Sequence, residues 1–185
     1  IVVNSAIANS VVGDKGLEDA RTMATITADV LNINPGEVLV CSTGVIGVPL
    51  PMDLIKDGIN KVKLIENDHG FSKAIMTTDT RPKEFAVSID MNGEKITVAG
   101  AAKGSGMIHP DMATMLAFLT TDARIASETL SRILSKAVDM SFNMVTIDGD
   151  SSTNDSVLMI ASGQVGSELI LNGQQEEDLQ SAVNN

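Results

Sequence analysis

The segment from Phe85 to Val98 contains the strongest short-range folding signal in the chain, because Asn92-Gly93 separates two runs in which apolar and polar residues alternate. Asn-Gly favours the two-residue turn of a β-hairpin, since both residues readily take the positive φ that this turn needs. The two strands of a hairpin pair antiparallel, so a sheet that contains this segment cannot be purely parallel.

Helical spacing marks three segments outside the hairpin. The first helix should follow the Gly13-Asp14 turn and end before Pro35-Gly36, and the second should be entered from Pro51. Ser127 is expected to cap the third helix. The apolar faces of these helices carry Leu17, Ala20, Ala24 and Leu31; Met52, Ile55, Ile59 and Val62; and Leu130, Ile133, Leu134, Ala137 and Val138.

Short apolar runs between these helices predict buried strands at residues 38–41, 115–119 and 157–161. Strands interleaved with amphipathic helices imply sheets covered by helices, which is an α/β fold with mixed sheets. No composition shift or low-complexity linker divides the 185 residues, so we expect one α/β domain over 1–185.

The charge and cysteine content narrow the classes of partner. A net charge of −11 without clustered Lys or Arg argues against nucleic acid or an anionic membrane surface as a partner. The single cysteine, Cys41, cannot form an internal disulfide, and no long apolar span or signal sequence is present, which favours a reducing, soluble compartment. Small molecules or proteins are the expected partners.

Thr114 opens an apolar run after the glycine-rich approach Lys103-Gly-Ser-Gly-Met-Ile-His-Pro-Asp-Met-Ala113. Its hydroxyl could attack the carbonyl of Ala113, convert the peptide to an ester and release a free α-amine by hydrolysis. That amine can then accept the hydroxyl proton when substrate arrives. The alternative from composition alone is an ordinary β-branched strand residue at Thr114.

Five segments agree with one family in order and spacing. They are Ile1-Val-Val-Asn-Ser5, Ser42-Thr-Gly-Val-Ile-Gly47 with Leu50-Pro-Met52, Met76-Thr-Thr-Asp-Thr80, the approach to Thr114, and Asp148-Gly-Asp-Ser-Ser-Thr-Asn-Asp155. Together they closely resemble the bifunctional ornithine acetyltransferase/glutamate N-acetyltransferases (the ArgJ family) around their self-cleavage site. The resemblance implies a layered helix-sheet-sheet-helix fold, distantly similar to N-terminal-nucleophile hydrolases.

The same resemblance implies residue roles. Cleavage between Ala113 and Thr114 would end an α chain with 1–113 and begin a β chain with 114–185, and Thr114 would be the nucleophile. Thr43 and Gly44 match the oxyanion hole, while Thr77, Lys103 and Thr114 match substrate contacts. The alternatives are a strand-to-loop turn at Thr43-Gly44, a turn hydrogen bond at Thr77 and a solvated loop charge at Lys103.

The implied activity is transfer of acetyl from N-acetylornithine to glutamate through a threonine acetyl-enzyme, in arginine biosynthesis. No metal or organic cofactor is implied, with acetyl-CoA as a possible alternative acetyl donor. The expected assembly joins α and β chains from one precursor in a heterotetramer or higher oligomer, in the cytoplasm or in mitochondria of a eukaryote. Family members are longer in both directions, so the sequence is expected to be an internal portion of the enzyme.

Two departures from the family pattern fall in the segment Asn4–Gly13. Ala6 stands where the family commonly has Gly, which removes backbone freedom, and Ile7 stands where it has Asn, which removes a polar group. This loop is therefore expected to pack differently. Asp111 replaces the usual Asn and adds a negative charge near the cut.

Other functions stay open from the residues alone. A self-processing aminopeptidase would use the same acyl chemistry with water as acceptor, and a noncatalytic or calcium-stabilised fragment would use none. Asp148 to Asn154 imitates the start of a calcium loop, but Thr153 occupies the position of the required Gly, so a hydrogen-bonded turn is the better interpretation. Cys41 lies in an apolar strand and is expected to be a buried structural cysteine.

Overall fold

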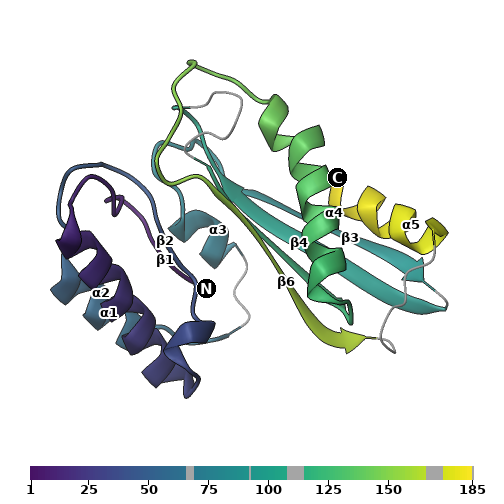
Figure 1. Ribbon diagram of the computed structural model, residues 1–185, viewed down its shortest axis with the longest axis horizontal. Coiled ribbons are helices and arrows are strands. Elements are labelled where there is room, and N and C mark those ends of the chain that lie inside the picture. Colours follow the sequence, from purple (N-terminus) through teal and green to yellow (C-terminus); the bar gives the residue numbers. More distant parts are fainter. Residues whose placement is uncertain (66–68, 92, 108–114, 166–172, 185) are drawn as a thin grey trace. The chain divides into compact units, whose positions relative to one another are not determined.

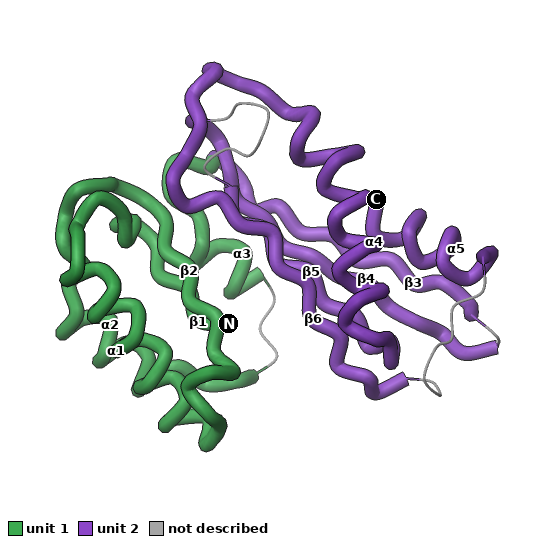
Figure 2. Tube along the Cα trace, viewed as in Figure 1, with its two compact units in different colours: residues 1–79 green, residues 80–185 purple. Residues whose placement is uncertain are grey.

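The computed structural model describes residues 1–65, 69–91, 93–107, 115–165 and 173–184. The chain divides into two compact units, Ile1–Asp79 and Thr80–Asn185, which Figure 2 shows in different colours. The prediction of one α/β domain stays a prediction, and so does its division by cleavage after residue 113. In the described part of the chain, no helix has the length and apolar character needed to span a membrane.

The first unit pairs a two-stranded parallel sheet with helices (Figure 1). Its elements are β1 (Val2–Asn4), α1 (Asp14–Leu31), the 3-10 turn η1 (Pro35–Glu37), β2 (Val40–Ser42), α2 (Met52–Lys61) and α3 (Gly70–Ala74). Helix α1 begins after the predicted turn and ends at Asn32, whose left-handed conformation lets its N–H reach the Ala28 and Asp29 carbonyls. Both predicted helices form, and β2 lies slightly later than the predicted strand. The predicted apolar face of α1 is wrong, because Leu17 and Leu31 are exposed and the core packs against the side of the helix that carries Met23.

The core of this unit is small and aliphatic. Met23 from α1, Ile59 from α2 and Leu50 are buried together. Partly buried side chains from both strands, both helices and the loop after β1 pack around them: Val2, Ile7, Ile26, Val40, Met52 and Ile55. Helices α1 and α2 therefore share one apolar core with the strands.

The second unit contains a four-stranded mixed sheet in the order β3-β4-β5-β6. Its elements are β3 (Lys83–Met91), β4 (Glu94–Lys103), β5 (Leu116–Ala123), α4 (Ser127–Met140), the 3-10 turn η2 (Phe142–Met144), β6 (Ser156–Val165) and α5 (Gly173–Asn184). The first three strands pair antiparallel, and β5 pairs with β6 in parallel. Met91 pairs with Glu94, so the hairpin has the predicted two-residue loop. The α/β class with mixed sheets is confirmed.

Helices α4 and α5 cover one face of this sheet (Figure 1). Ile96 of β4, Ile133 of α4 and Leu179 of α5 are each 0% exposed and lie in one cluster. The alternating side chains of β3 and the helical stripe of α4 also pack in this cluster, as the sequence predicted. The predicted cap is wrong in one detail: Ala126 occupies the N-cap position of α4 and no side chain caps the helix, because Ser127 is already its first residue.

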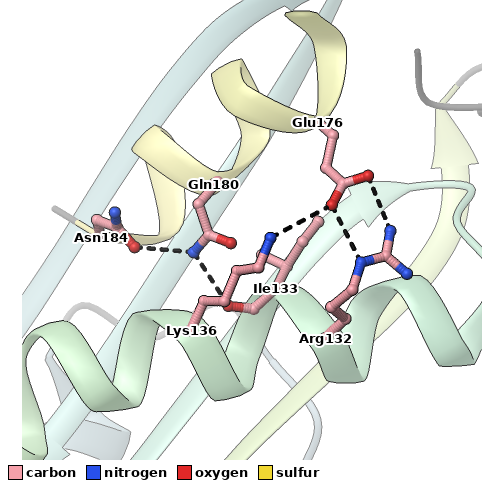
Figure 3. Close-up of polar contacts among 6 residues, drawn as sticks. All are labelled: Arg132, Ile133, Lys136, Glu176, Gln180 and Asn184. Carbon is pink, nitrogen blue, oxygen red and sulfur yellow. Dashed lines mark hydrogen bonds and ion pairs between the residues drawn. The ribbon is translucent and has the colours of Figure 1, made fainter. Parts of the chain in front are cut away.

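Polar contacts join α4 to α5 at the edge of this core (Figure 3). The Arg132 guanidinium donates two hydrogen bonds to the Glu176 carboxylate, at 2.8 and 3.1 Å, and Lys136 lies 3.8 Å from the same carboxylate. Gln180 Nε2 donates to the carbonyl oxygen of Ile133 at 3.0 Å. These contacts fix how the two helices lie against each other.

Candidate active site

The predicted site residues are distributed over both units. Thr43, Gly44 and Thr77 belong to the first unit and Lys103 to the second. Ala113 and Thr114 lie outside the described residues, so the predictions for cleavage and for the nucleophile stay predictions. The two parts of the site are described separately.

Thr43 directly follows β2 and is almost completely buried, with 1% of its surface exposed. Its N–H donates to the carbonyl oxygen of Asn4 at 3.1 Å, which continues the pairing of β2 with β1. Next to it, the Ser42 hydroxyl donates to Asn4 Oδ1 at 2.6 Å. Thr43 is thus held rigidly at the end of a strand, as the predicted oxyanion hole requires.

Glycine is the one residue type that fits at position 44. Its φ is +131°, and a Cβ there would lie 2.1 Å from the carbonyl oxygen of Ala6 and 2.7 Å from the nitrogen of Ile7. The backbones are this close because Val45 N–H donates to Ala6 O at 3.0 Å and Ala8 N–H donates to Val45 O at 2.9 Å. The close approach, together with the positive φ, explains the glycine.

The Gly44 N–H is left out of this pairing. Thr43 and Val45 both donate to the β1 side, and the N–H of the intervening Gly44 finds no acceptor among the residues that the structure describes. The end of β2 thus places a backbone N–H without an acceptor among the described residues beside the buried Thr43. The oxyanion hole at Thr43 and Gly44 stays a prediction.

Ala6 and Ile7, the two positions that depart from the family pattern, are the residues whose backbone lies against Gly44. Ala6 has φ +80°, which glycine takes freely and alanine does not, and its side chain is exposed. Ile7 packs against the core of the first unit. The replacement of a polar residue by Ile7 thus adds apolar packing under the loop.

Thr77 lies in the connection between α3 and β3 and is exposed. Its N–H donates to Asp79 Oδ2 at 3.3 Å, across two residues. This is the kind of turn hydrogen bond named as the alternative. Substrate contact through the Thr77 side chain stays a prediction.

Lys103 is not the solvated loop charge of the alternative interpretation. It is the last residue of β4, pairs in register with Leu116 of β5 and has 2% of its surface exposed. A buried ammonium needs negative charge nearby. The Asp155 carboxylate is close enough for the Lys103 charge to lower its pKa.

Asp155 was not among the predicted site residues. Its Oδ1 accepts the N–H of Met115 at 2.8 Å, directly beyond the predicted nucleophile. The pKa of the Asp155 carboxyl is raised, because the effect of burial exceeds those of the Met115 N–H, the Ser152 side chain and backbone and the Lys103 charge, which each lower it. The signal for it was its place at the end of the acidic, Ser-rich segment, just before an apolar strand.

The rest of that segment forms hydrogen-bonded turns, as predicted. Asp148 Oδ1 accepts from the N–H of Asp150 at 3.4 Å, and Ser152 Oγ accepts from the N–H of Asn154 at 3.2 Å. Throughout the described ranges, no three His, Cys, Asp or Glu side chains gather into a possible metal site. Cys41 is buried, and burial raises the pKa of its thiol, which disfavours a nucleophilic thiolate.

Comparison with known proteins identifies relatives over the whole chain. A sequence model of the ArgJ family matches residues 1–185. The arginine biosynthesis bifunctional protein ArgJ of Dehalococcoides mccartyi is 54% identical over 165 residues, which cover 89% of this chain and 41% of that protein. The protein of the same name from Streptococcus mutans is 50% identical over 183 residues, covering 99% of this chain and 46% of its own length.

A solved structure agrees with these matches. The crystal structure of arginine biosynthesis bifunctional protein argJ from Bacillus halodurans aligns with a TM-score of 0.56 and 50% sequence identity, over 58% of each chain. The predicted fold class is thus supported by a structure of similar sequence. The chain spans less than half the length of the curated relatives that it matches.

Proposed function

This chain belongs to the ArgJ family, and we propose that it forms part of an autoprocessing acetyltransferase that moves acetyl from N-acetylornithine to glutamate. The names of its relatives place them in arginine biosynthesis. Both substrates belong to the proposal, because the chain covers less than half of each of these relatives.

The reaction has two half-reactions at one hydroxyl. The Thr114 hydroxyl oxygen attacks the acetyl carbonyl carbon of N-acetylornithine, while the Thr114 α-amine takes the hydroxyl proton. The amide C–N bond then breaks, and the ornithine nitrogen leaves with that proton. In the second half-reaction the glutamate amine attacks the acetyl ester and gives a proton back to the threonine oxygen. No metal or organic cofactor takes part, and acetyl-CoA is an alternative donor to test.

The observation that carries the proposal is the strand end at Thr43-Gly44. Acyl transfer passes through a tetrahedral intermediate with negative charge on oxygen, and rigid donors aimed at that oxygen accelerate it. Gly44 supplies a backbone N–H without an acceptor among the described residues, held by close contact with Ala6. The Thr43 hydroxyl is the proposed second donor. Loss of one such donor typically lowers kcat about 10²- to 10³-fold.

Lys103 and Thr77 are proposed to bind the amino-acid part of the substrates. An ammonium pairs well with an amino-acid carboxylate, and the burial of Lys103 strengthens such a pair by excluding water. The exposed hydroxyl of Thr77 adds a donor and an acceptor.

Intact mass and acetyl exchange test the proposal. The intact protein should separate into two fragments that meet between Ala113 and Thr114. Thr114→Val keeps the β-branched shape but removes the hydroxyl, so it should stay uncut and transfer no acetyl. Thr114→Ser is the matched control, because it keeps the hydroxyl and should retain both activities.

Three outcomes contradict the proposal. Release of the acyl group to water, without transfer to glutamate and with hydrolysis of peptides, would favour the aminopeptidase. An uncut chain without acetyl exchange would favour a noncatalytic fold. Full exchange in Thr114→Val would exclude Thr114 as the nucleophile.

A further inference from the structure

Met115 is held at both of its backbone polar groups by the start of β6. Its N–H donates to Asp155 Oδ1 at 2.8 Å, and its carbonyl oxygen accepts from the N–H of Ser156 at 3.0 Å. The N–H and C=O of one strand residue point to the same side, so the Asp155 carboxylate supplies the acceptor that the neighbouring strand would otherwise provide. A side chain thus anchors the backbone directly after Thr114.

The second oxygen of the carboxylate is buried at the same place. Asp155 Oδ2 accepts no hydrogen bond within the described part of the chain. The contact with the Met115 N–H is therefore made by Asp155 Oδ1.

The Lys103 charge lowers the pKa of the Asp155 carboxyl, against the larger effect of burial, which raises it. Lys103 pairs with Leu116, and Leu116 pairs with Ser156, so the three residues form one row across β4, β5 and β6. Lys103 is at one end of this row, and Asp155 directly precedes Ser156 at the other end. A carboxylate binds a backbone N–H more strongly than a neutral acceptor does.

We propose that Asp155 is a positioning residue for Thr114, which fixes the Met115 amide and thereby the point from which the threonine amine and hydroxyl act. This inference rests on the proposed function, because it assigns no chemistry to Asp155 itself. Misplacement of a reacting group by about 1 Å can lower the rate about 10²-fold. Loss of the anchor should consequently slow both self-cleavage and acetyl transfer.

The test compares three variants of the intact protein. Asp155→Ala removes the acceptor, and Asp155→Asn keeps a side-chain oxygen that can accept the Met115 N–H. Asp122→Ala is the matched control, because Asp122 Oδ1 also accepts a strand N–H, from Thr97 at 2.8 Å, at the other end of β5. Each variant is measured for the rate of cleavage by intact mass, for kcat and KM of acetyl transfer, and for Tm.

Asp155→Ala should cleave slowly and lose about 10- to 100-fold in kcat, with KM for N-acetylornithine nearly unchanged. Asp155→Asn should recover most of this loss, and Asp122→Ala should lower Tm without lowering kcat. The inference is overturned if Asp155→Ala matches Asp122→Ala in kcat, or if Asp155→Asn is no better than Asp155→Ala. An inactive Thr114→Val beside a fully active Asp155→Ala would overturn this inference alone, whereas an active Thr114→Val would overturn the proposed function.

Discussion

Replacement of Gly44 by alanine tests the close approach at the end of β2. The added Cβ would lie 2.1 Å from the carbonyl oxygen of Ala6 and 2.2 Å from its carbon. Non-bonded heavy atoms rest at about 3.5 Å or more, so the Ala6 backbone must move by more than about 1 Å. Backbone cannot rotate away as the end of a flexible side chain can.

The magnitude follows from what that movement breaks. Ala6 O accepts the N–H of Val45 at 3.0 Å, and the next bond, from Ala8 to Val45, is 2.9 Å long. Loss of two hydrogen bonds costs about 1 kcal/mol each. Alanine at a φ of +131° adds about 1 to 3 kcal/mol of backbone strain. Gly44→Ala should therefore lower the free energy of unfolding by about 3 to 5 kcal/mol.

Denaturant unfolding of Gly44→Ala beside Gly47→Ala isolates the clash. Gly47 lies in the same loop with φ +74°, but a Cβ there would meet nothing within 4 Å. Gly47→Ala should therefore cost only the strain of a positive φ, about 1 to 2 kcal/mol. Equal losses of unfolding free energy in the two variants would refute the argument, because they would leave no energy for the contact with Ala6.

Two further predictions concern single positions. Ala6→Gly should raise the free energy of unfolding by about 1 kcal/mol, because Ala6 is exposed at φ +80° and loses no packing; a lower denaturant midpoint would contradict this. The hydrogen bonds from Arg132 hold the pKa of Glu176 below its usual range. Ionised Glu176 therefore stabilises the fold at a pH above the pKa that Glu176 has in the unfolded chain. This stabilisation is lost as the pH falls through the lower pKa of the folded state. Glu176→Gln should thus lower Tm slightly at pH 7 and match the parent in acid, and a Tm difference as large in acid as at pH 7 would contradict this.

The fold was predictable where a local pattern determines the structure. Asn92-Gly93 specified the hairpin because its turn type needs particular residues, and the apolar stripe of α4 identified its buried face. The parallel pairing of β5 with β6 was not predictable from the sequence, since a long connection lies between them. The sequence also did not indicate α3, whose five residues are too few for a helical period.

The site was predictable only in part, for a related reason. Motif order predicted Thr43 and Gly44 as site residues, and the close contact with Ala6 explains the glycine at position 44. Lys103 was identified as a cation but placed in a loop, because β4 extends through the small residues Ala99 to Ala102 that carry no alternating pattern. Nothing in the sequence indicated the contact between Asp155 and Met115, because that contact depends on the pairing of β6 with β5.

Both described parts of the site use the same structural principle. Regular sheet pairing consumes backbone N–H groups, whereas acyl transfer needs some of them aimed at substrate and others held still. At Gly44, pairing continues past β2 through Thr43 and Val45, and one donor between them stays available within the described structure. At Met115, beside the predicted nucleophile, the backbone is instead held still. The Met115 N–H donates to the Asp155 side chain. Substitutions at these two positions should therefore affect the rate of acetyl transfer more than those at the middle of the same strands.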